Sequence, residues 1–127
     1  MTKNNEVYPY TTSKPFTSIE VFEQTYPGLA KEFKQIQEEQ YKLFAEKMMS
    51  YGIDNISMGT NLENKEDIKL SLTAIWIRMN DKMNRLKNLV LKNNPNPLDN
   101  EPILDAWIDL VNYSIIAQLV STNKWKK

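Results

Sequence analysis

The sequence contains neither cysteine nor histidine. Without cysteine there is no disulfide framework, no thiolate nucleophile and no zinc–thiolate site. Without histidine, the commonest general base and the commonest metal ligand are both missing. Serine–histidine and cysteine–histidine catalysis are therefore excluded, and any chemistry must use carboxylates, lysine, tyrosine or a hard metal ion held by oxygen ligands.

The sequence also lacks an excess of charge of either sign and a long hydrophobic run. The formal net charge is zero, so the composition gives no strong signal for DNA, RNA or an anionic membrane surface. The N-terminus lacks the apolar run of a signal peptide, and no stretch approaches the roughly 20 apolar residues that span a bilayer. We therefore expect no membrane association and a cytoplasmic location, in the host cytoplasm if a phage encodes the protein.

The spacing of apolar residues predicts an all-α fold. Three principal helices are expected, at about residues 29–51, 65–92 and 101–122, with a short helix beginning after Thr17 or Ser18. Asn64 and Asn100 are the predicted N-caps of the second and third principal helices. The last helix is apolar around more than half of its circumference, so we expect it to be largely buried, and we expect the bundle to be completed by oligomerisation.

The predicted organisation is a single helical domain, residues 17–122. Residues 1–16 carry two prolines and several threonines without a sustained period, which indicates an extended N-terminal arm. Residues 123–127 form a polar C-terminal tail in which Trp125 is either exposed or docked. At 127 residues, the chain is long enough to bury one core.

A polar stripe runs along the long predicted helix beside its apolar face. At about 100° per residue, one face combines both arginines of the chain with further polar residues. In a chain this rich in lysine, two arginines on one face favour a requirement for the planar guanidinium group, which binds phosphate with two parallel hydrogen bonds. The members of the stripe are Ser71, Arg78, Asp81, Lys82, Arg85 and Asn88.

The last predicted helix carries an acidic seam, formed by Glu101, Asp105, Asp109 and Asn112. An unpaired buried carboxylate is costly, so the seam must face water, a metal ion or cations of a neighbouring helix. Two interpretations remain open. The seam and the polar stripe form an inter-helix ion-pair ladder, or together they hold a phosphate-bearing ligand, with the three carboxylates as tentative Mg²⁺ ligands. In the second case, Asn88, Asn112 and Tyr113 would supply hydrogen bonds to a sugar or base.

Two strings carry a resemblance to a known family. They are R-M-N-D-K-M-N-R-L-K-N-L at 78–89 and E-P-I-L-D-A-W-I-D-L-V-N-Y at 101–113, with K-M-M-S-Y-G from Lys47 as a third. They resemble the nucleotide modification associated domain, a small helical family of phages and bacteria that is similar to the MazG-like all-α nucleoside triphosphate pyrophosphohydrolases. The resemblance covers roughly residues 30–120. It implies an oligomeric helical bundle with nucleotide-related ligands, and adds Lys47 to the candidate binding residues.

Three functions follow from these patterns. The first is a phage-type protein that binds, and thereby sequesters, a nucleotide or nucleotide-derived signal between the long and last helices. The second is a Mg²⁺-dependent nucleotide pyrophosphohydrolase, although residues 29–51 lack the paired glutamates E-x-x-E, and Glu101 and Asp105 are one residue too far apart for E-x-x-D. The third is a non-catalytic, structural or protein-binding helical module.

A second apolar line marks the long predicted helix. Leu70, Ile77, Asn84 and Leu91 recur every seven residues, away from the polar stripe. We expect a packing ridge that seats either a further helix of the same chain or the same ridge of a second copy.

Overall fold

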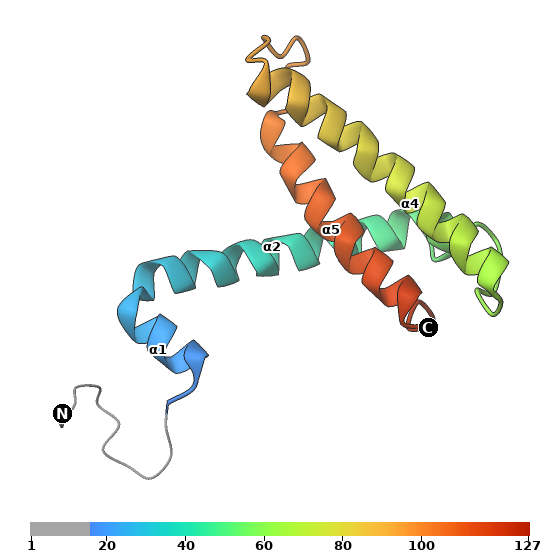
Figure 1. Cartoon of the computed structure of the whole chain (residues 1–127), viewed down its shortest axis with the longest axis horizontal. Coiled ribbons are helices and arrows are strands. Elements are labelled where there is room, and N and C mark those ends of the chain that lie inside the picture. Colours follow the sequence, from blue (N-terminus) through green and yellow to red (C-terminus); the bar gives the residue numbers. More distant parts are fainter. Residues whose placement is uncertain (1–15) are drawn as a thin grey trace. The chain divides into compact units, whose positions relative to one another are not determined.

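The computed structural model describes residues 16–127, and every regular element in that range is helical (Figure 1). The predicted all-α class is therefore confirmed. The elements are α1 (Ser18–Thr25), α2 (Pro27–Tyr51), α3 (Asp54–Ser57), α4 (Lys65–Leu86), η1 (Lys87–Leu91) and α5 (Ile103–Ser121). The predicted N-terminal arm lies outside the described residues apart from Phe16. The chain divides into two units after Glu39, within α2, and each unit is described by itself.

The described part of the first unit, residues 16–39, contains α1 and the beginning of α2. Thr17 caps α1 as predicted: its side chain accepts a hydrogen bond from the backbone of Glu20, and the Glu20 carboxylate accepts one from the Thr17 N–H. Helix α2 begins at Pro27, two residues before the predicted start, because proline fits the first helical turn, where no N–H is needed. Ala30 is the buried residue of this part, so these helices have almost no core of their own.

In the second unit, residues 40–127, α2 ends at Tyr51 and the chain turns at Gly52. Gly52 has φ +80°, a left-handed conformation that suits glycine, and its N–H bonds to the Met48 carbonyl. The short helix α3 follows, between this turn and α4. Asn64 caps α4 as expected, because its side chain accepts a hydrogen bond from the Asp67 N–H.

The junction between α4 and α5 differs from the prediction. The last turn of the long helix, η1, is π-helical, with the Lys92 N–H bonded to the Lys87 carbonyl five residues earlier. The prediction that Asn100 caps the last helix is wrong. The N-cap is Pro102, whose extended backbone (φ −63°, ψ 153°) prevents the helix from beginning before Ile103.

The core of the second unit lies where α3, α4 and α5 meet the end of α2. Trp125 docks there: its indole N–H donates to the Ile53 carbonyl over 3.2 Å, and its ring meets Phe44 edge to face. The sequence alone had left open whether Trp125 is exposed or docked. The buried residues of this cluster are Ile56, Leu62, Ile75, Ile116, Val120 and Trp125.

Helix α5 is less buried than the sequence predicted. Only Ala106, Ile116 and Val120 of this helix are buried, and four large apolar side chains remain exposed: Leu104, Trp107, Val111 and Ile115. The apolar circumference of α5 is wider than the surfaces that α4 and α2 offer it. By length and mean hydropathy (1.4), α5 is also the one helix in residues 16–127 that could cross a membrane. Core helices of soluble proteins meet the same criteria, so this is weak evidence for a membrane span.

Candidate functional site

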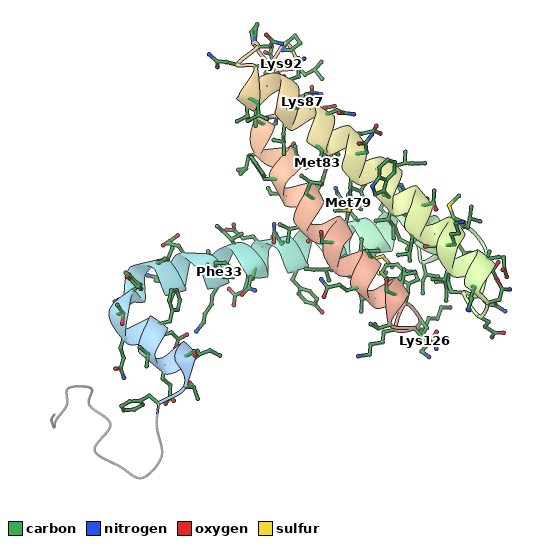
Figure 2. All side chains as sticks on the ribbon, in the orientation of Figure 1. Phe33, Met79, Met83, Lys87, Lys92 and Lys126 are labelled. Carbon is green, nitrogen blue, oxygen red and sulfur yellow. The ribbon has the colours of Figure 1, made fainter. Side chains whose placement is uncertain are left out.

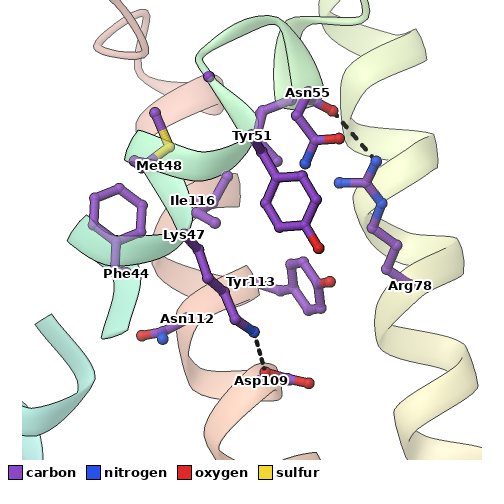
Figure 3. Close-up of a pocket in the computed structure, with 12 residues that line it drawn as sticks. Phe44, Lys47, Met48, Tyr51, Asn55, Arg78, Asp109, Asn112, Tyr113 and Ile116 are labelled. Carbon is purple, nitrogen blue, oxygen red and sulfur yellow. Dashed lines mark hydrogen bonds and ion pairs between the residues drawn. The ribbon is translucent and has the colours of Figure 1, made fainter. Parts of the chain in front are cut away.

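A pocket of about 260 Å³ opens in the second unit where four helical segments meet (Figure 3). The last two turns of α2 form one wall, α3 forms the rim, and α4 and α5 form the remaining walls. Gly52 lets the chain turn back after α2 and so brings α3 to the rim. The lining residues are Phe44, Lys47, Met48, Tyr51, Gly52, Asn55, Ile56, Arg78, Asp109, Asn112, Tyr113 and Ile116.

Asp109 of α5 joins three helices through one carboxylate. One carboxylate oxygen lies 3.2 Å from the Nζ of Lys47 on α2, and the other lies 3.1 Å from the Nζ of Lys82 on α4. The Asp109 side chain is only 15% exposed, whereas those of Lys47 and Lys82 are 48% and 31% exposed. Two ammonium groups therefore share one negative charge and retain hydrogen-bonding capacity toward solvent or a ligand.

Arg78 supplies a second cation to the lining of the pocket, beside Lys47. Its guanidinium donates one hydrogen bond of 3.3 Å to the Asn55 carbonyl, which holds the side chain against the rim formed by α3 (Figure 3). A guanidinium has five N–H donors, so this single contact leaves most of them available. The lining thus combines two cations, Arg78 and Lys47, with one carboxylate, that of Asp109, and the pocket favours an anion by charge.

Aromatic rings and amides complete the walls. Tyr51, at the end of α2, and Tyr113, on α5, present their rings to the pocket beside Lys47 and Arg78 (Figure 3). The Asn112 amide donates to the Gln40 carbonyl over 3.4 Å, a long hydrogen bond that still orients its side chain. The pocket therefore combines flat apolar surfaces with cations and amide groups, which is the chemistry that recognises a planar ring carrying an anionic group.

The structure brings together six of the residues that the sequence singled out. Five line the pocket and the sixth, Lys82, binds Asp109. Four of the six come from the polar stripe (Arg78 and Lys82) and the acidic seam (Asp109 and Asn112), and one ion pair, between Lys82 and Asp109, joins the two. The six are Lys47, Arg78, Lys82, Asp109, Asn112 and Tyr113.

The other site residues predicted from the sequence lie outside the pocket. The Arg85 guanidinium binds the backbone carbonyls of Glu101 and Pro102 and so fastens the loop before α5 to α4. Asn88 accepts a hydrogen bond from the Asn94 side chain at the far end of the long helix. The remaining three, Asp81, Glu101 and Asp105, are exposed and do not line the pocket.

The tentative metal ligands Glu101, Asp105 and Asp109 do not come together around one point. Among the described residues, no group of three or more carboxylate side chains is close enough to hold a metal ion. Asp109 is the one member that lines the pocket, and there it already binds two lysines. The Mg²⁺ site remains a prediction from the sequence.

Several lining residues were not identified as site residues from the sequence. Tyr51 has the residue type and spacing of an apolar helix face, although its spacing of four residues from Lys47 places both on one side of a helix. Asn55 gives no signal in the sequence, because its contribution is a backbone carbonyl of the short helix α3. Phe44, Met48 and Ile116 could not be told from ordinary core residues by type or spacing.

Comparison of the chain with models of known families, with curated protein sequences and with solved structures found no match.

Proposed function

We propose that the second unit binds a nucleotide or nucleotide-derived signal in the pocket between α2, α3, α4 and α5, and sequesters it. The observation that carries this proposal is a pocket lined by two cations, Lys47 and Arg78, one carboxylate, Asp109, and two tyrosine rings. A phosphate group would bind Lys47 or Arg78, which lie on either side of the rings in Figure 3. A base would stack on Tyr51 or Tyr113, because aromatic stacking accepts any base.

The size of the pocket limits the size of the ligand that it can bind. Pockets for drug-sized molecules measure about 300 to 1,000 Å³, so a pocket of about 260 Å³ suits a mononucleotide better than an extended dinucleotide. The resemblance to the nucleotide modification associated domain gives independent support from residues 78–89 and 101–113. Both strings contribute to the lining of the pocket, through Arg78 in the first and Asp109, Asn112 and Tyr113 in the second, and Lys82 of the first string binds Asp109.

A panel of nucleotides tests the proposal. The protein is incubated with nucleoside mono-, di- and triphosphates and with cyclic nucleotides, with and without Mg²⁺, and both the melting temperature and product formation are followed. Binding without turnover raises the melting temperature and yields no product. A ligand at a hundred times its dissociation constant stabilises the folded state by about 2.7 kcal/mol. Product formation would favour the pyrophosphohydrolase, and the absence of both effects would favour the structural module.

Matched substitutions connect any binding to this pocket. Lys47→Gln should weaken binding at least about tenfold, because a hydrogen bond to a charged group contributes about 1.5 to 3 kcal/mol. Lys42→Gln is its control, an exposed lysine of the same helix outside the pocket. Tyr51→Ala should weaken base binding, whereas Tyr41→Ala, an exposed tyrosine ten residues earlier, should not. Equal effects of variant and control would place the ligand elsewhere.

The contributions of the charge and of the planar shape of the Arg78 guanidinium to ligand binding can be measured separately. Arg78→Lys keeps the positive charge and removes the guanidinium fork. If the fork binds phosphate, this variant loses affinity for phosphorylated ligands and keeps its affinity for the unphosphorylated nucleoside. If the Arg78→Lys variant binds both ligands as the wild type does, Arg78 does not contact the phosphate.

A further inference from the structure

One side of the α4–α5 pair carries an apolar surface that nothing in the described residues covers. We call it the open face and define it by Trp76, Met79 and Met83 of α4 and Trp107 and Val111 of α5. Trp76, Met83, Trp107 and Val111 are 63%, 55%, 51% and 42% exposed, and Met79 lies half-buried beneath them against the core. Figure 2 shows Met79 and Met83 following one another along α4 on the side toward the viewer.

The two helices contribute to one continuous surface. They run antiparallel (Figure 1), and the pair between Lys82 and Asp109 sets their register. Counting outward from that pair places Met83 level with Trp107 and Met79 level with Val111. The polar pocket lies on another side of the same helices, because Arg78 and Lys82 are about 100° or more around α4 from Met83 and Trp76.

The five residues of the open face are uncharged, and Lys87, one turn beyond Met83 on the same side of the long helix, marks its edge. Helix α5 has only two charged residues, Asp105 and Asp109, and the second is held by lysines at the pocket. In a chain that is 25% charged, a two-helix surface made of tryptophan, methionine and valine is unusual for a side that faces water. Tryptophan and methionine are also enriched at the centres of protein–protein interfaces.

The area fits a partner of similar size. A fully exposed aromatic side chain offers about 150 to 250 Å², so the open face with the flanking Leu104 and Ile115 exposes on the order of 600 Å² of apolar surface. A standard interface buries about 800 Å² on each partner, including its polar rim. A second antiparallel helix pair has the length and width to cover such a surface. The two pairs together form a four-helix arrangement, in which apolar helix faces are commonly buried.

We propose that the open face binds the open face of a second copy of this chain, around a two-fold axis. Met83 and Trp107 of each copy then pack against the other copy at the centre of the interface. A self-complementary interface needs a surface without net charge, because like charges would otherwise meet across the axis, and the open face meets this condition. The pocket stays accessible on both copies, so self-association and ligand binding are separate properties.

A matched pair of methionine substitutions tests this proposal. Met83→Glu places a charge at the centre of the open face, and Met49→Glu places the same charge on α2, where Met49 is 88% exposed. Sedimentation velocity over a range of protein concentrations should show dimers for the wild type and for Met49→Glu, and monomers for Met83→Glu. A monomeric wild type, or a Met83→Glu variant that still dimerises as the wild type does, would overturn the proposal.

Cross-linking supplies a second test that does not depend on how the glutamate variant folds. The chain has no cysteine, so a single introduced cysteine can form a disulfide only between copies. Under mild oxidation, Met83→Cys or Met79→Cys should give a covalent dimer much faster than Met49→Cys. A faster reaction of Ile77→Cys, on the heptad-spaced ridge around α4 from the open face, would show that a different surface associates.

A lipid surface is the other occupant to distinguish, because α5 is apolar along its length. The wild-type protein is mixed with vesicles of neutral and of anionic phospholipid and centrifuged. We expect it to remain in the supernatant, since its open face is covered by the second copy. Co-sedimentation of the wild type that Met83→Glu abolishes would assign the face to the membrane and overturn the dimer.

Discussion

Ser71 of α4 donates a hydrogen bond of 2.6 Å from its hydroxyl group to the backbone carbonyl of Ile56 in α3, and both residues are buried. This contact holds α3 against α4, and α3 in turn provides the carbonyl of Asn55 that orients Arg78 at the pocket. A core contact thereby determines where one wall of the candidate site lies.

Replacing Ser71 should destabilise the fold. In Ser71→Ala the buried carbonyl of Ile56 loses its side-chain donor, which costs about 1 to 3 kcal/mol. Ser50→Ala, an exposed serine at the end of α2, is the control and should remain within about 0.5 kcal/mol of the wild type. Urea unfolding followed by circular dichroism measures both. Equal midpoints for Ser71→Ala and the wild type would show that the hydrogen bond contributes nothing to stability.

The docked Trp125 should contribute strongly to stability although it is the third residue from the end of the sequence. Trp125→Ala removes a side chain that contacts Phe44 and fills part of the core, and such substitutions cost about 3 to 5 kcal/mol. Trp125→Phe keeps an aromatic ring but loses the hydrogen bond to the Ile53 carbonyl, so its cost should be intermediate. Thermal unfolding ranks the variants. A Trp125→Ala variant as stable as the wild type would mean that the tail is undocked in solution.

Asp109→Asn should increase the stabilisation of the protein by added anions. Without the carboxylate, Lys47 and Lys82 lose their shared counter-charge, and stability falls by about 1 kcal/mol, because both lysines are partly solvated. Added phosphate should restore more stability to this variant than to the wild type. Asp81→Asn makes the same charge change at an exposed position of α4 and serves as the control. An identical phosphate response in the two variants would argue against an anion site at Asp109.

The capping box of α1 predicts a pH dependence. Hydrogen bonds from the Thr17 backbone and side chain hold the pKa of Glu20 below its ordinary value of 4.5. Because the folded-state pKa is the lower one, this stabilisation of α1 is fully present above the unfolded-state pKa and is lost as the pH falls through the folded-state pKa. Carbon-detected NMR titration of the Glu20 carboxyl group measures the shift. Thr17→Ala removes the side-chain hydrogen bond and keeps the backbone one, so it should return the pKa part of the way toward 4.5, and an unchanged pKa would rule out the Thr17 side chain as a cause.

The helices could be predicted because their signals are local. Asn64 and Thr17 are caps whose side chains bond within the next three residues, and Gly52 ends α2 through its own left-handed backbone. The Asn100 cap failed although it has the same local signal. Pro102, two residues later, disfavours the helical conformation of Glu101, the residue before it, and the sequence does not show which of two adjacent signals determines where the helix starts.

The candidate site could be predicted only in part, since it depends on how distant segments meet. The helical period placed Arg78, Lys82 and Arg85 on one face, but it could not show that Arg85 binds backbone carbonyls while Arg78 reaches the pocket. Ser71 shares that face and lies in the core. The helical period predicts in which direction each side chain points around one helix. Which residues that side chain contacts depends on the chain segments packed beside the helix.

The distances along the sequence between contacting residues suggest an order of folding. Arg85 and Pro102 are 17 residues apart, whereas Lys47 and Asp109 are 62 apart, and Ile53 and Trp125 are 72 apart. Contacts between nearby residues form faster, so we expect the α4–α5 hairpin to close first and the end of α2 to dock afterward. The same long-range contacts form the α2 wall of the pocket. Within the second unit, this wall is therefore the part that we expect to open by local unfolding at the lowest free-energy cost, which hydrogen exchange of α2 amides would detect.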